Sequence, residues 1–451
     1  MARSGVIYFL FLGIMILSGC GKDEWEGLES PSGTLFEITS DAQQVRVPVR
    51  SSSTWEVTGK AGKWYRFRQV KGEKVDTLVL DLTVNIARQG RGVNLQLASD
   101  AGTLGIEVRQ AAATGDYFFE LPIVFHVLHD SPGNNIPAGK LTSCLDKVNA
   151  LYANASGKGV DMGFRFVLAT RDPDGKLLDE PGIHRVRRAG LPMSGKKFVD
   201  NAFGDVAMMW NQREYINVVV FPFTEDLFGV AYTPFMPQGI AVPGLTQTDW
   251  YATRLPDDFV YCMAWNTTLI DYTYTIAGEG VVIEAGGYIT LAHELGHYLG
   301  LLHPFTNGKG EVGDYCDDTP DYDWDEYESY LVMLDETTTS PGEFYREAVK
   351  RVALDGTRFV SENFMDYDIG YMWSSTPDQR ARVRTVLENA WMIPGPKIDL
   401  PGARSEDMVK PDKPKPVSLL AILYFFTDWR NIGIRLSICP MERRLAIIPV
   451  L

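Results

Sequence analysis

The sequence predicts a multidomain protein in which an all-β domain precedes an α+β domain. Short strands separated by turn residues fill residues 33–112. After the segment "AAATGD", long apolar runs and helical periodicity alternate over residues 117–396. The length of 451 residues leaves room for two or three cores, and 45% hydrophobic with 22% charged residues is ordinary for a folded protein.

The N-terminal domain is expected to be a small β-sandwich over residues 33–112. Stretches such as "QQVRVPVR" and "TLVLDLTVNI" alternate or run apolar, and breaks such as "RQGRG" separate them. The segments "SSSTWEV", "KWYRF" and "IEVRQA" resemble the BACON domain, an immunoglobulin-like module of surface proteins. Trp55 and Trp64 are the marker aromatics of that resemblance. We expect both in the sandwich core; the alternative is an exposed platform that stacks on glycans.

A linker over residues 113–116 leads into the α+β domain. Its first strand is expected in "ELPIVFHVLHD", with further strands in "GFRFVLAT" and "YINVVVFPF". A helix is expected in "KLTSCLDKVNALYANAS", and a last one after the capping sequence "TPDQ". His126 and His129 lie on or beside the first strand. No second ligand stands near them at metal spacing, so we expect packed or surface histidines.

The N-terminus is typical of an export signal. Arg3 precedes an apolar run, Val6–Leu17, that is too short for a permanent membrane span. The run ends in "LSGC", which resembles a bacterial lipobox and implies a signal peptide over residues 1–20 with lipid on Cys20; the alternative is a plain secretory signal. The acidic "KDEWE" in the tether, residues 21–32, resembles surface-export signals. We therefore expect an outer-membrane lipoprotein exposed at the cell surface.

Charge and cysteine content narrow the partners and the compartment. The net charge of -15, without a long basic cluster, argues against nucleic acid as a partner. Beyond Cys20, four cysteines would lie in an oxidising compartment where disulfides are permitted. Their pairing is not fixed by the sequence; the four are Cys144, Cys262, Cys316 and Cys439.

The stretch "HELGHYLGLLH" is typical of a metal site. His293 and His297 are four residues apart, so on a helix both side chains reach one ion, and Glu294 lies beside the first of them. Gly300 lets the chain leave the helix, and His303 can then return to the same ion. Three imidazoles leave the fourth zinc position open to water, as in a catalytic zinc site. A histidine-rich core helix is the alternative, but three uncompensated histidines on an apolar face are costly.

The pattern HExxHxxGxxH is the signature of metzincin metallopeptidases, whose second mark is a Met-containing turn. The segment "SENFMDY", Ser361–Tyr367, resembles that turn, with Met365 as its methionine. The segments "NFMDY", "GDYCDDTP" and "TPDQRARV" are similar to the pappalysin group. The strands "IVFHVLH", "FRFVLATRDPDGK" and "INVVVF" follow in that group's order, so the resemblance implies an α+β metzincin catalytic domain over residues 117–396.

The resemblance also implies roles. His293, His297 and His303 would bind zinc, and Met365 would pack beneath them. Glu294 would be the general base for a zinc-bound water that attacks a peptide carbonyl. Tyr367 matches a position that in some metzincins binds zinc or the oxyanion; the alternative is a packed tyrosine under the site.

A second ion is expected in the acidic stretch from Asp314 to Glu328. A charge run is usually a solvated loop. Here the density of oxygen ligands and the pappalysin resemblance at Asp314 and Thr319 favour a structural calcium site. Cys316 stands inside this loop, and one option is that it pairs with Cys262.

The leading hypothesis is a lipid-anchored zinc metalloendopeptidase that cleaves extracellular proteins or peptides. The alternatives are a surface adhesin whose sandwich binds glycans beside a vestigial peptidase fold, and a zinc hydrolase of non-peptide substrates. The tail over residues 397–451 has no assigned role. Its apolar run "VSLLAILYFF" is about half the length of a membrane span and could form a packed strand.

Overall fold

The chain forms two compact units, residues 1–112 and residues 113–451. The computed structural model describes residues 26–200, 205–225, 227–270, 273–278, 281–306, 313–367, 369–398, 410–412, 417–420, 436–438 and 445–447. Cys20 and Cys439 lie outside the described residues, as does the expected signal peptide. None of the helices within the described ranges has the length and apolar character needed to span a bilayer.

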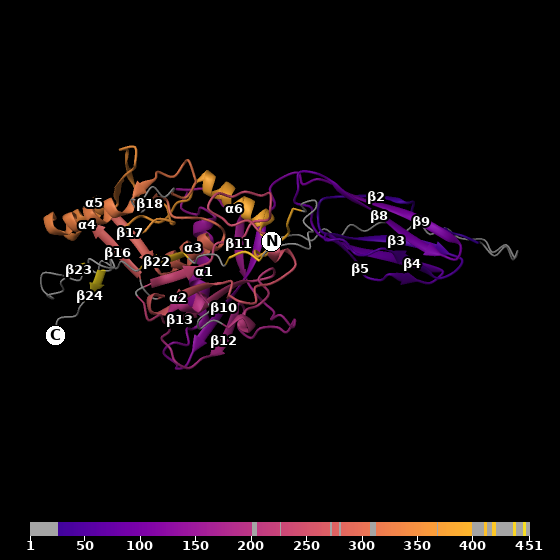
Figure 1. The fold of residues 1–451 in the computed structure, drawn as a ribbon, viewed down its shortest axis with the longest axis horizontal. Helices are drawn as coiled ribbons and strands as arrows, with labels where there is room; N and C mark the ends of the chain where they lie inside the picture. Colours follow the sequence, from indigo (N-terminus) through magenta and orange to yellow (C-terminus); the bar gives the residue numbers. More distant parts are fainter. Residues whose placement is uncertain are drawn as a thin grey trace. The chain divides into compact units, whose positions relative to one another are not determined.

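The first unit is built from two β-sheets that share one core (Figure 1). One sheet has the order β1-β3-β7-β5 and the other the order β2-β9-β8-β4-β6. The strands are β1 (Leu28–Glu29), β2 (Leu35–Ile38), β3 (Gln43–Ser51), β4 (Trp55–Thr58), β5 (Tyr65–Phe67), β6 (Lys71–Gly72), β7 (Val75–Leu82), β8 (Arg91–Ser99) and β9 (Gly102–Gln110). In β3, buried Val45, Val47 and Val49 alternate with outward residues, so one face of the strand supplies the core.

Trp55 belongs to this core, and Trp64 is partly buried and packs against it. Trp55 is 1% exposed, and Trp64 packs against the same cluster with the Arg91 guanidinium 4.6 Å from its ring centroid. The expectation of a core side chain is confirmed for Trp55, whereas Trp64 lies at the border of the core. The more specific immunoglobulin-like and BACON-like assignments of this unit stay predictions.

The second unit is centred on a mixed seven-stranded sheet with the order β11-β10-β13-β15-β14-β22, with β12 also pairing with β10. Its strands are β10 (Phe119–His129), β11 (Phe164–Leu168), β12 (Ile183–Arg187), β13 (Ile216–Phe221), β14 (Leu227–Ala231), β15 (Met263–Asn266) and β22 (Val417–Leu420). β10, β11, β12, β13 and β15 are parallel along their pairings, whereas β14 is antiparallel to β15 and β22 is antiparallel to β14. All six residues of β13 are buried, as its continuous apolar run predicts.

Helices pack on this sheet and around it. They are α1 (Ala138–Tyr152), α2 (Gly195–Val199), α3 (Gly287–Tyr298), α4 (Trp324–Thr337), α5 (Pro341–Ala348) and α6 (Pro377–Asn389), with 3-10 turns η1 (Val206–Met208), η2 (Trp250–Ala252) and η3 (Thr267–Leu269). α1 and α3 lie side by side (Figure 1), and α3 contacts β14 and β15. The expected capping box of α6 is present. The Thr376 hydroxyl accepts from the backbone N–H of Gln379, and the side-chain oxygen of Gln379 accepts from the backbone N–H of Thr376.

Short two-stranded ribbons complete the unit. They are β16 (Thr273–Gly278) with β17 (Val281–Gly286), β18 (Phe305–Thr306) with β19 (Tyr322–Asp323), β20 (Lys350–Val352) with β21 (Arg358–Val360), and β23 (Leu436–Ile438) with β24 (Leu445–Ile447). The run "VSLLAILYFF" does contribute a strand, because its first four residues form β22.

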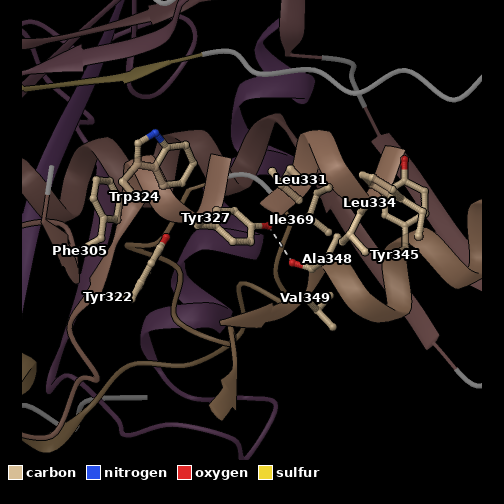
Figure 2. Close-up of a cluster of buried hydrophobic side chains, with 11 residues drawn as sticks. Phe305, Tyr322, Trp324, Tyr327, Leu331, Leu334, Tyr345, Ala348, Val349 and Ile369 are labelled. Atoms are coloured by element: carbon tan, nitrogen blue, oxygen red, sulfur yellow. Dashed lines mark hydrogen bonds between the residues drawn. The ribbon is translucent and has the colours of Figure 1, made fainter. Parts of the chain in front are cut away.

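The acidic stretch is not a solvated loop throughout, because its last part is helical. Asp323 caps α4 by accepting from the backbone N–H of Glu326 at 3.2 Å. The acids in the first turn stabilise the helix by their interaction with the positive end of its dipole. Trp324 and Tyr327 then begin a buried face of α4 at helical spacing. Figure 2 shows this face packed with α5 in one cluster, where the Tyr327 hydroxyl donates to the Ala348 carbonyl at 2.7 Å. The acids therefore lie on the outer face of a helix, and their number in the sequence obscured the helical spacing of its apolar residues.

Candidate metal centre and active site

Helix α3 carries the first two histidines of the motif. Every residue from Thr290 to Tyr298 is buried, so the helix is enclosed on all sides. The Tyr152 hydroxyl on α1 donates to the Ala292 carbonyl at 2.8 Å and fixes the helix beside its neighbour. His293 and His297, one turn apart, consequently present their rings in one direction inside the protein.

The chain leaves α3 through Gly300. Its φ of +93° lies in the left-handed region, and a Cβ added there would stand 2.8 Å from Cγ2 of Val386 on α6. Arg382, also on α6, donates to the Gly300 carbonyl at 2.6 Å and holds this exit. The glycine is thus required by backbone conformation and by space, and the turn brings His303 back under the helix.

The three histidines converge on one point. The Nε2 atoms of His293 and His297 are 3.0 Å apart, those of His293 and His303 are 3.1 Å apart, and those of His297 and His303 are 2.9 Å apart. Among the described residues they are the one group of three or more His, Cys, Asp or Glu side chains close enough to share an ion. The three nitrogens are close enough together to hold one zinc ion at the usual zinc–imidazole distance of about 2 Å.

The protonation of the rings suits metal binding. Nδ1 of His293 donates to the Phe364 carbonyl at 3.0 Å, and Nδ1 of His297 donates to the Leu301 carbonyl at 2.9 Å, which leaves both Nε2 lone pairs facing the centre. Burial and the neighbouring imidazoles hold the pKa of His293 and of His303 well below the ordinary range, and burial lowers the pKa of His297 to about 4. The rings are neutral at pH 7, which is the form that binds a metal ion.

Glu294 lies on α3 next to the first ligand and is fully buried. The backbone of Gly229 on β14 lies against its side chain: a Cβ at Gly229 would stand 2.5 Å from Cγ and 2.8 Å from Oε1 of Glu294. Only glycine at this place lets the edge of the sheet approach the carboxylate so closely. The sheet edge and the candidate base therefore form one wall of the site.

The Met-containing turn lies beneath the histidines. Met365 is fully buried, and its Sδ would be 2.4 Å from a Cβ placed on Gly296, between the two helical ligands. The preceding residue, Phe364, supplies the carbonyl that orients His293. The structure thus places Met365 under the site, where the sequence resemblance predicts it.

Tyr367 lies beside the third histidine. Its ring centroid is 4.3 Å from that of His303 and 5.7 Å from that of His293. The Phe305 ring contacts both of these side chains: it stacks on His303 with ring centroids 4.8 Å apart, and its centroid is 4.7 Å from that of Tyr367. Trp324 packs against Tyr367 at 5.2 Å, which joins the site to the cluster in Figure 2.

A buried polar network holds the chain around Tyr367. Asp366 accepts from the Tyr322 hydroxyl at 2.5 Å, from the Tyr367 amide at 2.8 Å and from the Ser361 hydroxyl. The Arg351 guanidinium lies 3.8 Å from Asp366, with the two side chains 0% and 3% exposed, and donates to the Tyr367 carbonyl at 3.3 Å. Hydrogen bonds from both terminal nitrogens of Arg351 to backbone carbonyls help to offset the burial of this pair.

The residues expected to bind calcium are occupied with other bonds. Asp314 is buried; one of its oxygens accepts from the Cys316 amide at 3.0 Å and the Thr319 hydroxyl at 2.6 Å, and the other accepts from Gln379 at 3.3 Å. Within the described residues this arrangement fastens the loop to α6. Burial raises the pKa of Asp314. A calcium site here stays a prediction.

The option of a Cys262–Cys316 disulfide is wrong, because both thiols are free. Cys262 is fully buried next to β15, and Sγ of Cys316 faces the carbonyl of Asp314 at 3.7 Å. The bracing that the sequence left open is instead supplied by the hydrogen bonds of Asp314.

Sequence reasoning missed three contributors to the site: Gly229, Asp366 and Arg351. A lone glycine in the strand "LFGVA" does signal a close backbone approach, although nothing in the sequence says what approaches. Arg351 lies far from the motif in sequence, and its buried pairing with Asp366 depends on tertiary packing.

Residues 243–388 match the family model Peptidase M43, described as pregnancy-associated plasma protein-A. Mature mirolysin of Tannerella forsythia in complex with a cleaved peptide is 22% identical with a TM-score of 0.39, over 60% of this chain and 92% of that one. A promirolysin mutant of the same organism is 19% identical with a TM-score of 0.40, over 62% and 84%. A Bacteroides ovatus xyloglucanase is 13% identical with a TM-score of 0.19, over 44% and 37%. No curated protein sequence matched the chain.

The structural similarities, with TM-scores below 0.5, add nothing to the assignment. The matched residues 243–388 contain α3, the three histidines and the turn at Met365. The pappalysin resemblance predicted from the motifs is confirmed over residues 243–388, which match the M43 peptidase family.

Proposed function

We propose that the second unit is a zinc-dependent endopeptidase that hydrolyses peptide bonds of extracellular proteins or peptides. The observation that carries this proposal is the triangle of Nε2 atoms, 2.9–3.1 Å on a side, with the buried Glu294 carboxylate next to it. Zn²⁺ held by His293, His297 and His303 would supply Lewis-acid polarisation of the scissile carbonyl and a lowered pKa of water at the open position.

The protein's own groups then move the proton and hold the substrate. Glu294 takes a proton from the attacking water and passes it to the amine as the peptide bond breaks. Its side chain is fully buried against the Gly229 backbone, which keeps bulk water away from the carboxylate. Tyr367, beside His303, would donate its hydroxyl proton in a hydrogen bond to the oxyanion that forms at the carbonyl.

The test has two readouts on the full chain. Elemental analysis of the purified protein should give one zinc per chain, and His297→Ala should lose it. The native protein should cleave fluorescein-labelled casein. Cleavage should stop after treatment with 1,10-phenanthroline and return when zinc is restored. A protein without stoichiometric zinc, or cleavage that survives complete metal removal, would sink the proposal.

We also propose lipid attachment at Cys20 and exposure on the outer membrane of a bacterium. Support comes from the lipobox-like "LSGC" and the acidic "KDEWE". Labelling of the expressed full chain with radioactive palmitate should succeed for the native sequence and fail for Cys20→Ser. Protease accessibility on intact cells would test surface exposure.

A structural calcium ion near Asp314 and Thr319 remains part of the proposal, supported by the acidity of the segment up to Glu328. Calcium should raise the melting temperature of the native protein and not that of Asp314→Asn. Glycan binding by the first unit receives no support from Trp55, whose ring is enclosed in the core.

A further inference from the structure

The C-terminal segment is attached to the catalytic unit at two points. β22 adds antiparallel to β14, with Leu420 opposite Leu227, Leu419 opposite Gly229, and Val417 opposite Ala231. Upstream of β22, the Lys410 ammonium lies 2.9 Å from the Asp257 carboxylate and 3.3 Å from that of Asp258. A backbone ladder and an ion pair thus place this segment along one edge of the sheet.

That edge belongs to the candidate active site. β14 runs antiparallel to β15 and lies against α3, and the Gly229 backbone on β14 touches the Glu294 side chain. Leu419 is paired with Gly229 itself, and β22 also contacts α3. Paired strands are about 4.8 Å apart, so β22 runs one strand spacing from the residue that contacts the candidate base.

An extended polypeptide is the form that such an edge accepts. An unpaired strand offers a row of N–H and C=O groups that a second strand can complete, and peptides bind to many proteins in this way. β22 already uses these groups on β14. A substrate peptide that paired with β14 would have to displace it.

We propose that β22 is an internal occupant of the peptide-binding edge that competes with substrate and so lowers the activity of the peptidase until the strand is displaced or removed. This inference rests on the proposed function and deepens it by assigning a regulation to the same site. β22 has only four residues. The ion pair upstream of it is exposed, with the Lys410 side chain 35% and the Asp257 side chain 84% exposed. Exposed pairs are weak and are screened by salt, so the attachment is suited to release.

The experiment weakens the strand without touching the catalytic groups. Leu419→Pro places proline in β22, where it removes an N–H and cannot continue a ladder. Asp412→Pro is the matched control, because it puts the same residue in the same segment outside the strand. Both substitutions and the parent are made in the full chain carrying Glu294→Ala, so that a bound peptide is not consumed.

Binding of fluorescein-labelled oxidised insulin B chain, an unfolded peptide, is followed by anisotropy on the zinc-loaded proteins. The Leu419→Pro protein should bind with a dissociation constant at least about tenfold lower than that of the parent, because occupancy by β22 reduces the competent fraction. The Asp412→Pro protein should match the parent. Equal affinities in all three proteins, or binding by none of them, would overturn the inference.

A cleavage arm separates this inference from the proposed function. The same three proteins with Glu294 restored are assayed on labelled casein. Tighter binding by Leu419→Pro with no cleavage by any protein would refute the peptidase activity and leave the competition by β22 standing. Equal cleavage with equal binding would uphold the peptidase and refute the competition by β22.

Discussion

At the residue scale, the sequence predicted which histidines form the candidate metal centre but not how their imidazole rings are oriented. His293, His297 and His303 follow from spacing alone, because four residues make one helical turn. The tautomers do not, because they depend on the carbonyls of Phe364 and Leu301, which accept from the two helical imidazoles. Ligand choice is local in sequence, whereas ligand orientation is set by tertiary contacts.

Tyr367 can be tested as a residue that touches the substrate. If its hydroxyl bonds the oxyanion, Tyr367→Phe should lower kcat on a peptide substrate by about 10²-fold with little change in KM. The ring packing against His303 and Phe305 is retained in phenylalanine, so zinc content and melting temperature should not change. Steady-state kinetics checks this, and a kcat within twofold of the native value would assign Tyr367 to packing alone.

His126 should make the second unit sensitive to acid. Its ring is buried, Nε2 donates to Asn217 at 2.8 Å, and Nδ1 accepts from His184 at 2.8 Å. The expectation of a packed histidine at this position is therefore confirmed. Burial lowers the pKa of His126 to about 3, so the unfolded chain binds a proton between pH 6.5 and 3 that the folded chain does not.

Stability should therefore fall as pH falls through that window, by up to about 1.4 kcal/mol per pH unit from this group. His126→Gln should show a shallower fall, measured by urea unfolding of the full chain at pH 6, 5 and 4. His129→Gln, at the end of the same strand, is the control. Parallel slopes for the native protein and His126→Gln would contradict this assignment.

At the element scale, strongly patterned segments were predictable and packing-dependent ones were not. β10, β13 and α6 lie where continuous apolar runs or a capping box predict them. The start of α4 was hidden, because its acids mask the apolar spacing that begins at Trp324. β14 was also missed, because a strand of five residues carries too little pattern to stand out.

The contact between β14 and α3 gives the sharpest prediction at this scale. Gly229→Ala should force the Glu294 side chain to move, since the new Cβ would stand 2.5 Å from its Cγ. We expect kcat/KM on casein to fall by about 10²-fold or more with zinc content preserved. Gly139→Ala on α1, where a Cβ meets nothing within 4 Å, is the matched control and should keep native activity. Native activity in Gly229→Ala would show that the sheet edge does not position the base.

At the scale of the whole molecule, the metal should stabilise one unit and not the other. Residues 1–112 and 113–451 are separate compact units, and all three candidate ligands belong to the second. Bound zinc should stabilise that unit by about 4 kcal/mol at a free concentration of 1,000 times its dissociation constant. Calorimetry with and without a chelator should therefore shift the transition of the second unit by several degrees. A shift of both transitions, or of neither, would contradict this picture.

The central claim is that Glu294 and the three histidines hydrolyse peptide bonds. The most direct measurement compares the native chain with Glu294→Gln, both loaded with zinc, on a panel of denatured proteins and a peptide library. Replacing a general base costs about 10²–10⁴-fold in rate, so only the native protein should cut detectably, and the cut sites would define its specificity. Equal cutting by both proteins would contradict the role of Glu294, and cutting by neither, with β22 released by Leu419→Pro, would contradict the peptidase itself.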